Sequence, residues 1–166
     1  VSAETYIARE ASTASLEQLQ NATALVEKGV PLSPQLANAL LYGSSIGGAR
    51  PKSVIASRDK EFIAKFSSQN DLYNLVKAEF VAMRLAEKVG LTVAPVMLER
   101  TAGKDVILVE RFDRHKTADG WQRSAVVSAL TLLELDELMA RYASYEDLAT
   151  VIRHRFVKPK ETLKEL

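Results

Sequence analysis

Residues 43 to 114 hold four features whose order constrains the fold more than anything else in the chain. A glycine-rich turn at 43–52 comes first, and a short strand that carries Lys65 follows it. An amphipathic helix that carries Glu79 comes next, and a second pair of strands ends in the charged run 110–114. These patterns predict an α+β fold, in which a small antiparallel sheet has a covering helix and is flanked by helices at both ends.

Hydrophobic periodicity and capping residues predict the bounds of the elements. Two hairpins are expected, one pairing 53–57 with 61–66 and the other pairing 93–99 with 106–111. Asn70 or Asp71 is expected to cap the central helix, and Gly43 to end the helix before it. Ser15 and Gln18 are expected to form a capping box for the first helix, which Gly29 would end. The run from Ser144 should cap a later helix, and Pro159 should begin the last one. Helices are expected over 16–28, 34–42, from that cap to about 89, over 130–142, and from 145 onward.

Composition excludes several classes of site. The chain of 166 residues has no cysteine and two histidines, so neither disulfides nor zinc–thiolate sites are expected, and we expect no metal site. The net charge of +1 gives no basic field for direct binding of nucleic acid. No apolar stretch approaches the ~20 residues of a membrane helix. We therefore expect a cytoplasmic protein with no membrane partner.

The glycine-rich turn is the first candidate for ligand binding. Glycines let backbone N–H groups approach a phosphate without a clash from Cβ, and Arg50 and Lys52 add positive charge. The turn is not a Walker A loop, because no Lys-Ser/Thr pair follows Gly48. It is not a dinucleotide fingerprint either, since a helix precedes it and a strand follows it. The alternative is a flexible turn without a ligand.

Lys65 and Glu79 form the second candidate. Lys65 lies in mid-strand on the face opposite Phe62, Ala64 and Phe66, where a lysine is commonly just solvated. Glu79 lies on or beside the apolar stripe of its helix, and a carboxylate that faces inward needs a partner. We therefore predict that Lys65 and Glu79 are in contact. The alternative for Glu79 is a boundary position tilted into water.

The third candidate is the run Glu110-Arg111-Phe112-Asp113-Arg114 at the end of an apolar strand. Backbone groups at such a strand end can pair with the edge of an adenine ring, although a simple charged strand exit would look the same. The order of glycine loop, strand lysine, helix glutamate and strand end is how one lobe of a protein kinase holds ATP.

These motifs resemble the HipA family of serine/threonine protein kinases, which act as toxins in bacterial toxin–antitoxin modules. The resemblance covers roughly residues 30 to 160. It rests on Gly-Gly-Ala-Arg-Pro-Lys at 47–52, Lys65, Glu-Phe-x-Ala-Met-x-Leu-Ala-x-x-x-Gly-Leu at 79–91 and Val-Glu-Arg-Phe-Asp-Arg at 109–114.

The resemblance implies a role for each matching residue. Lys65 would contact the phosphates of ATP, and Glu79 would be its ion-pair partner. Glu110 and Phe112 would bind adenine through their backbones, with Asp113 near the ribose. Ser45 would be a possible site of autophosphorylation. The phosphate loop would comprise Ser45, Ile46, Gly47, Gly48, Ala49, Arg50 and Lys52.

The resemblance also implies the cofactors and partners. They would be ATP with Mg²⁺, a protein substrate, and an antitoxin of the HipB type, through which any association with DNA would run.

The chain departs from the family in its last third. No segment after Arg114 matches the catalytic Asp and Asn of the family, so no catalytic residue is assigned within this chain. We expect a fragment that is inactive alone, with a helical segment at 1–42, an ATP-binding region at 43–114 and the start of a helical lobe at 115–166. The alternative is a non-catalytic interaction or regulatory module of a toxin–antitoxin system.

Overall fold

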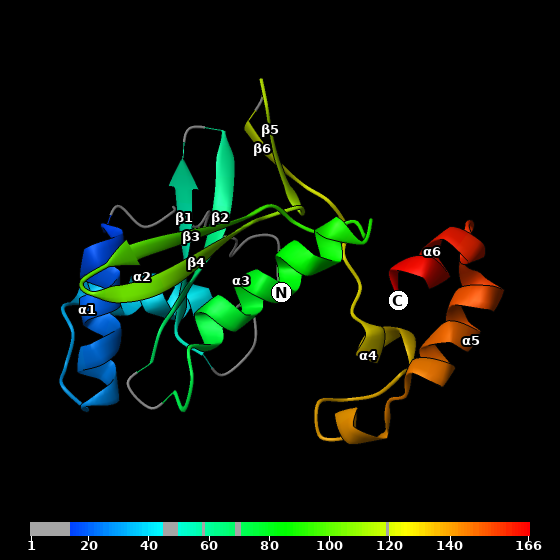
Figure 1. The fold of residues 1–166 in the computed structure, drawn as a ribbon, viewed down its shortest axis with the longest axis horizontal. Helices are drawn as coiled ribbons and strands as arrows, with labels where there is room; N and C mark the ends of the chain where they lie inside the picture. Colours follow the sequence, from blue (N-terminus) through cyan, green and yellow to red (C-terminus); the bar gives the residue numbers. More distant parts are fainter. Residues whose placement is uncertain (1–13, 45–49, 58, 69–70, 119) are drawn as a thin grey trace, which may run out of the picture.

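The structure is a computed structural model, and it describes residues 14–44, 50–57, 59–68, 71–118 and 120–166. Groups of helices and groups of antiparallel strands follow one another along the chain (Figure 1). They are α1 (Leu16–Glu27), α2 (Pro34–Ser44), β1 (Lys52–Ser57), β2 (Lys60–Phe66), α3 (Leu75–Lys88), β3 (Val96–Thr101), β4 (Lys104–Glu110), β5 (Arg114–Thr117), β6 (Gly120–Arg123), α4 (Ala129–Leu132), the 3₁₀ helix η2 (Ala140–Tyr142), α5 (Tyr145–Arg155) and α6 (Pro159–Glu165).

Four strands form the main sheet, in the order β1-β2-β4-β3. Each neighbouring pair is antiparallel, and the two predicted hairpins are confirmed as β1–β2 and β3–β4. The two hairpins join where β2 pairs with β4, which places Phe62 opposite Glu110 and Lys65 opposite Ile107. The predicted α+β fold with a small antiparallel sheet, a covering helix and flanking helices is therefore correct.

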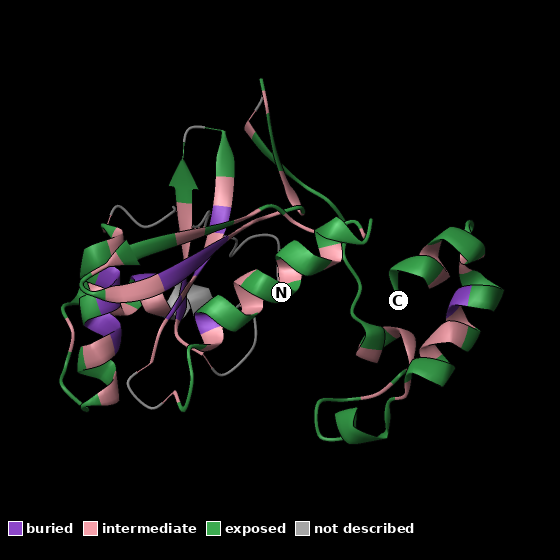
Figure 2. Cartoon of the chain, in the orientation of Figure 1, coloured by how far each residue is buried: buried purple, intermediate pink, exposed green. Residues whose placement is uncertain are grey.

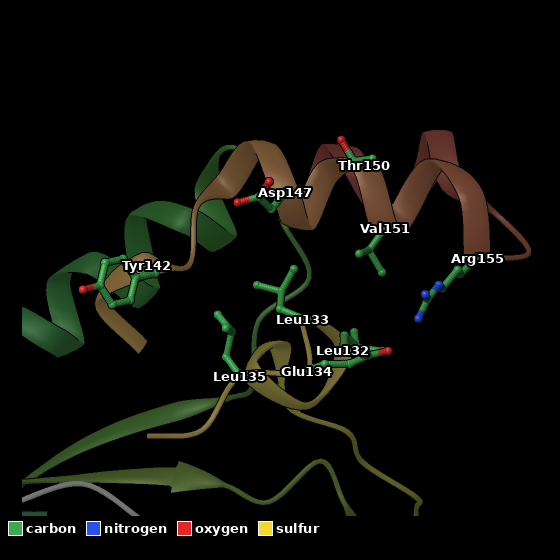
Figure 3. A pocket seen from close by; sticks show the side chains of 9 residues that line it. All are labelled: Leu132, Leu133, Glu134, Leu135, Tyr142, Asp147, Thr150, Val151 and Arg155. Atoms are coloured by element: carbon green, nitrogen blue, oxygen red, sulfur yellow. The ribbon is translucent and has the colours of Figure 1, made fainter. Parts of the chain in front are cut away.

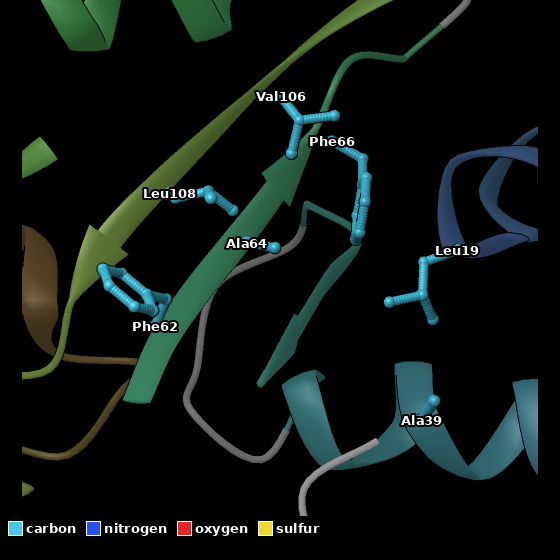
Figure 4. Close-up of a cluster of buried hydrophobic side chains, with 7 residues drawn as sticks. All are labelled: Leu19, Ala39, Phe62, Ala64, Phe66, Val106 and Leu108. Atoms are coloured by element: carbon cyan, nitrogen blue, oxygen red, sulfur yellow. The ribbon is translucent and has the colours of Figure 1, made fainter. Parts of the chain in front are cut away.

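One face of this sheet packs against α1 and α2. Side chains at alternate positions of β2 and β4 point to this face, and both strands are buried there. Figure 4 shows them converging on one side chain from α1 and one from α2. The cluster comprises Leu19, Ala39, Phe62, Ala64, Phe66, Val106 and Leu108. The N-terminal helices thus share one core with the sheet, while the predicted domain boundary at residue 43 stays a prediction.

The opposite face of the sheet packs against α3. Val76 of the helix and Ile107 of β4 are both buried, and Ile107 points away from the Leu108 side of the sheet. Lys65 is directly across from Ile107 and therefore shares that face. The alternation of β2 thus sends Phe62, Ala64 and Phe66 toward α1 and α2 and places Lys65 on the opposite face, as predicted.

The capping predictions hold for several helices. Ser15 and Gln18 form a capping box at α1, with bonds of 3.2 and 2.8 Å between each side chain and the other residue's N–H. Ser144 caps α5, and Pro159 begins α6. Gly29 follows α1 with φ +69°, a conformation that glycine adopts without a steric penalty. The prediction that Gly43 ends α2 is wrong, since that helix runs to Ser44.

The predicted start of the central helix is also wrong. Helix α3 begins at Leu75, after a cap at Asn74 whose Oδ1 accepts from the N–H of Lys77 at 2.9 Å. Asp71 cannot cap it, because its carboxylate is bound to Arg50 instead. Asn70 lies outside the described residues. The sequence offered several capping residues in a row, and a long-range partner decided among them.

The helix predicted over 130–142 is broken. Helix α4 ends at Leu132, and Glu134 follows with φ +58°, a left-handed conformation that stops an α-helix. The N–H of Leu135 bonds back to the carbonyl of Leu130 at 2.9 Å, which closes the helix end. The chain turns helical again only at η2. The β5–β6 hairpin, which pairs residues 114–117 with 120–123, was not predicted.

Candidate nucleotide site

Lys65 and Glu79 meet between the sheet and α3. Lys65 Nζ forms a hydrogen-bonded ion pair with Glu79 Oε1, which confirms the predicted contact. Both side chains are about one-third exposed, at 28% and 35%. The pair therefore lies at the margin of the core, where a ligand can reach the ammonium group. The position of Glu79 three residues after buried Val76 explains why the carboxylate points toward β2.

A second lysine stands beside this pair. Lys52 of β1 lies directly opposite Lys65 of β2 in the register. Burial lowers the pKa of Lys52 below its ordinary value, and the positive charge of Lys65 lowers it further. Like charges placed opposite each other on neighbouring strands destabilise a sheet. The two ammonium groups therefore make this part of the α3 face favourable for an anion.

Arg50 fixes the chain just before β1. Its Nη1 and Nη2 donate to the two carboxylate oxygens of Asp71 at 2.8 and 2.7 Å, and Nη2 also donates to the carbonyl of Phe66 at 3.1 Å. The hydrogen bond from Arg50 holds the pKa of Asp71 below its usual value. The N–H of Ser68 donates to the same carboxylate at 3.0 Å. Arg50 thus ties the end of the glycine-rich segment to the loop after β2.

The end of β4 forms the other candidate region. The N–H of Glu110 bonds to the carbonyl of Pro95 at 2.9 Å, and the N–H of Arg111 bonds to the carbonyl of Glu61 at 2.8 Å. Within the part of the chain that the structure describes, the backbone of Phe112 forms no such bond. The side chain of Phe112 is 68% exposed. The carboxylate of Glu110 pairs with Lys60 at 2.6 Å and borders the same strand end.

Asp113 lies between two arginines. Its carboxylate accepts from Arg111 Nε and Nη2 at 3.0 and 2.7 Å, and from Arg114 Nη1 at 2.6 Å. The hydrogen bond from Arg111 lowers the pKa of Asp113. Glu61 of β2 approaches the same two arginines at 3.6 and 3.8 Å. We call these four residues, Glu61, Arg111, Asp113 and Arg114, the strand-end network.

The two regions lie at a fixed separation along β2. Glu110 is opposite Phe62, and Lys65 is three residues further along the same strand. At about 3.3 Å per residue this amounts to roughly 10 Å. The structure thus brings Lys52, Lys65 and Glu79 together, and places Glu110, Phe112 and Asp113 apart from them at the other end of β2. Ser45, Ile46, Gly47, Gly48 and Ala49 of the predicted phosphate loop lie outside the described residues.

Several residues of the region were not predicted from the sequence. The sequence favours Asp71 as a helix cap, and no pattern in it singles out Glu61. The alternating charges at 110–114 were a signal for local ion pairs, but nothing local indicated a partner on β2. Among the described residues, no group of three or more His, Asp or Glu side chains could hold a metal ion. None of the described helices is long and apolar enough to cross a membrane.

A hollow of about 450 Å³ lies in the helical region, apart from these residues. Figure 3 shows Leu133 and Leu135 of the turn after α4 facing the side of α5 that carries Val151. Asp147 and Arg155 line the same hollow. Its lining combines leucine and valine side chains with polar and charged ones, and it contains none of the residues predicted to bind ATP.

Comparison with known proteins places the chain in a family. Residues 44–166 match the family model described as HipA-like C-terminal domain, and the chain belongs to this family. The resemblance inferred from the motifs is therefore correct. A protein of Sinorhizobium fredii named "Putative kinase Y4mE" is 32% identical over 118 residues, which cover 61% of this chain and 28% of that protein.

Two solved structures are similar in fold. The HipA complex with HipB and operator DNA from Shewanella oneidensis MR-1 matches 72% of this chain and 34% of that chain, with a TM-score of 0.53 and 22% identity. The proinflammatory kinase CtkA from Helicobacter pylori matches 69% of this chain and 39% of that chain, with a TM-score of 0.50 and 22% identity. The chain thus spans between 28% and 39% of the length of each of these three proteins.

Proposed function

We propose that this chain is the ATP-holding part of a HipA-like protein kinase. The observation that carries the proposal is the Lys65–Glu79 ion pair between β2 and α3. In protein kinases, a strand lysine that contacts the phosphates is held in place by a helix glutamate. Here the family membership and the observed pair support the same role.

The charges around Lys65 fit a polyphosphate. Glu79 holds the ammonium group of Lys65 at the margin of the core, and Lys52 brings a second ammonium group to the same face. An arriving anion relieves the repulsion between the two lysines, so that part of the unfavourable charge pairing is recovered on binding. Arg50 supports the site indirectly, because Asp71 and the carbonyl of Phe66 already occupy its guanidinium.

The base would lie at the end of β4. The backbone of Phe112 is the available partner for adenine, since the N–H groups of Glu110 and Arg111 are bonded within the fold. Phosphate binding by Ser45 to Ala49, and autophosphorylation of Ser45, remain part of the proposal. Mg²⁺ would come with ATP, because the described residues include no group of carboxylates suited to hold a metal ion by themselves.

The reaction proposed for the whole protein is transfer of a phosphoryl group from ATP to a serine or threonine hydroxyl of a protein. This chain would not catalyse it alone, since Asp119, Asp136 and Asp147 are the only aspartates after Arg114 and none lies in a kinase catalytic motif. The HipA of Shewanella oneidensis is seen with HipB and operator DNA. By analogy we propose a HipB-type antitoxin as partner, with DNA contacted through that partner.

Isothermal titration of the chain with Mg-ATP tests the proposal. We expect saturable binding to the wild type and at least about tenfold weaker binding to Lys65→Met, because a charge-assisted hydrogen bond to phosphate is lost. Glu79→Gln should weaken binding less, since the lysine keeps its charge and loses only its orientation. Lys158→Met is the matched control. Lys158 is the exposed N-cap residue of α6, and it forms an ion pair with Glu161. Absence of ATP binding by the folded wild type would contradict the proposal and favour a non-catalytic interaction module.

A further inference from the structure

The charges within the strand-end network balance one another. It contains two guanidinium groups and two carboxylates, and all four side chains are 12–21% exposed. Asp113 accepts three hydrogen bonds from the two arginines, so much of the acceptor capacity of its carboxylate is used within the network. Charge-assisted bonds of this kind, shielded from solvent, hold a backbone segment more firmly than surface pairs do.

The network joins three elements around one residue. Glu61 belongs to β2, Arg111 follows the end of β4, and Arg114 begins β5. The carbonyl of Asp113 also accepts from Arg114 Nη1 at 2.9 Å and from the N–H of Ser124, beyond β6, at 3.1 Å. Phe112 lies in the middle of this clamped segment. The backbone on both sides of Phe112 is therefore held by long-range partners, while Phe112 itself has no backbone partner among the described residues.

We propose that the strand-end network is a positioning device that sets the preference of the site for adenine over guanine. It does so by fixing the direction of the Phe112 N–H group. Adenine presents an unprotonated ring nitrogen, N1, on its Watson–Crick edge, whereas guanine presents an N–H at the same position. A fixed backbone donor bonds to the first and repels the second. A backbone free to rotate would accommodate either base. The preference therefore depends on the strand-end network, which holds the backbone, rather than on a side chain that touches the base.

The proposal rests on the proposed function and is tested on the whole chain with three probes. ATP and GTP report on the base, and inorganic tripolyphosphate reports on the lysine region alone. We expect Asp113→Asn to lower the ratio of ATP to GTP affinity by about tenfold, the worth of one net hydrogen bond. Tripolyphosphate affinity should stay unchanged. Glu61→Gln, which removes the weaker contacts at 3.6 and 3.8 Å, should give a smaller change in the same direction.

Asp136→Asn is the matched control. Asp136 is exposed, and an asparagine oxygen can still accept the bond from the N–H of Met139. An unchanged ATP to GTP ratio in Asp113→Asn would overturn the proposal, as would an equal loss of affinity for all three probes, which indicates a purely structural role. Wild-type protein that binds tripolyphosphate but does not prefer ATP over GTP would also overturn the proposal. The proposed role of the lysine region in binding phosphates would then still stand. A folded wild type that binds none of the three probes would refute the proposed function, and this inference with it.

Discussion

The sheet region and the C-terminal helical region differ in how much interior they have. Among the described residues, ten of the eleven buried apolar side chains lie between Leu19 and Leu108, and Ile152 is the other. Figure 2 shows the contrast, with buried positions along β2, β4 and α1 and mostly exposed positions across α4, α5 and α6. The sheet buries both faces against helices, whereas α5 is covered on part of one side. Rigid placement of the candidate site therefore depends on the first region.

The two regions also use polar contacts differently. In the sheet region, ion pairs join distant elements, as Arg50 does with Asp71 and Arg111 does with Glu61. In the helical region most of the side-chain hydrogen bonds are local, between residues three or four apart. Local bonds stabilise single turns, and long-range bonds fix one element relative to another. We expect the two regions to respond differently to mutation.

The largest effect is expected for Phe66→Ala in the sheet core. Phe66 is fully buried, and truncation of a buried phenylalanine costs about 3–5 kcal/mol of unfolding free energy. Urea unfolding followed by circular dichroism measures the loss. Leu138→Ala, at a position that is 84% exposed, should change the unfolding free energy by less than about 0.5 kcal/mol. Similar losses in both variants would show that burial does not distinguish these positions.

A smaller effect, confined to one region, is expected for Ile152→Ala. The side chain is 3% exposed, but few buried neighbours surround it, so the loss should be near the lower limit for such truncations, about 2 kcal/mol. Amide hydrogen exchange should accelerate along α5 and stay unchanged in β2 and β4. Equal acceleration in the strands would instead show that the two regions unfold as one unit.

The smallest effect is expected for Asp71→Asn, and it should depend on pH. The pKa of Asp71 in the folded protein lies below its ordinary value of 3.8. A lowered pKa contributes stability that is present above pH 3.8 and is lost as pH falls through the folded-state pKa. The variant should therefore be about 1–2 kcal/mol less stable than the wild type at pH 7, with the difference shrinking toward pH 2. A difference that stays constant with pH would exclude the ion pair as its cause.

Local patterns in the sequence were sufficient for much of the fold. Alternation in β2 placed Lys65 opposite the core residues, and helical periodicity placed Glu79 next to buried Val76, so their contact could be predicted. Ser15, Ser144 and Pro159 marked helix starts correctly, because caps act over three or four residues. The motifs at 47–52, 79–91 and 109–114 were sufficient to indicate the HipA-like family, which the match over residues 44–166 confirms.

Only the tertiary structure decided which charges pair over long distances. Asp71 could have capped α3, but Arg50, 21 residues earlier, binds its carboxylate once β1 and β2 are side by side. Glu61 reaches Arg111 only because the β2–β4 register brings the two strand ends together. The left-handed turn at Glu134 likewise interrupts a segment whose composition favours a helix. Periodicity and caps describe contacts within a few residues, whereas ion pairs between distant elements depend on a register that no short segment specifies.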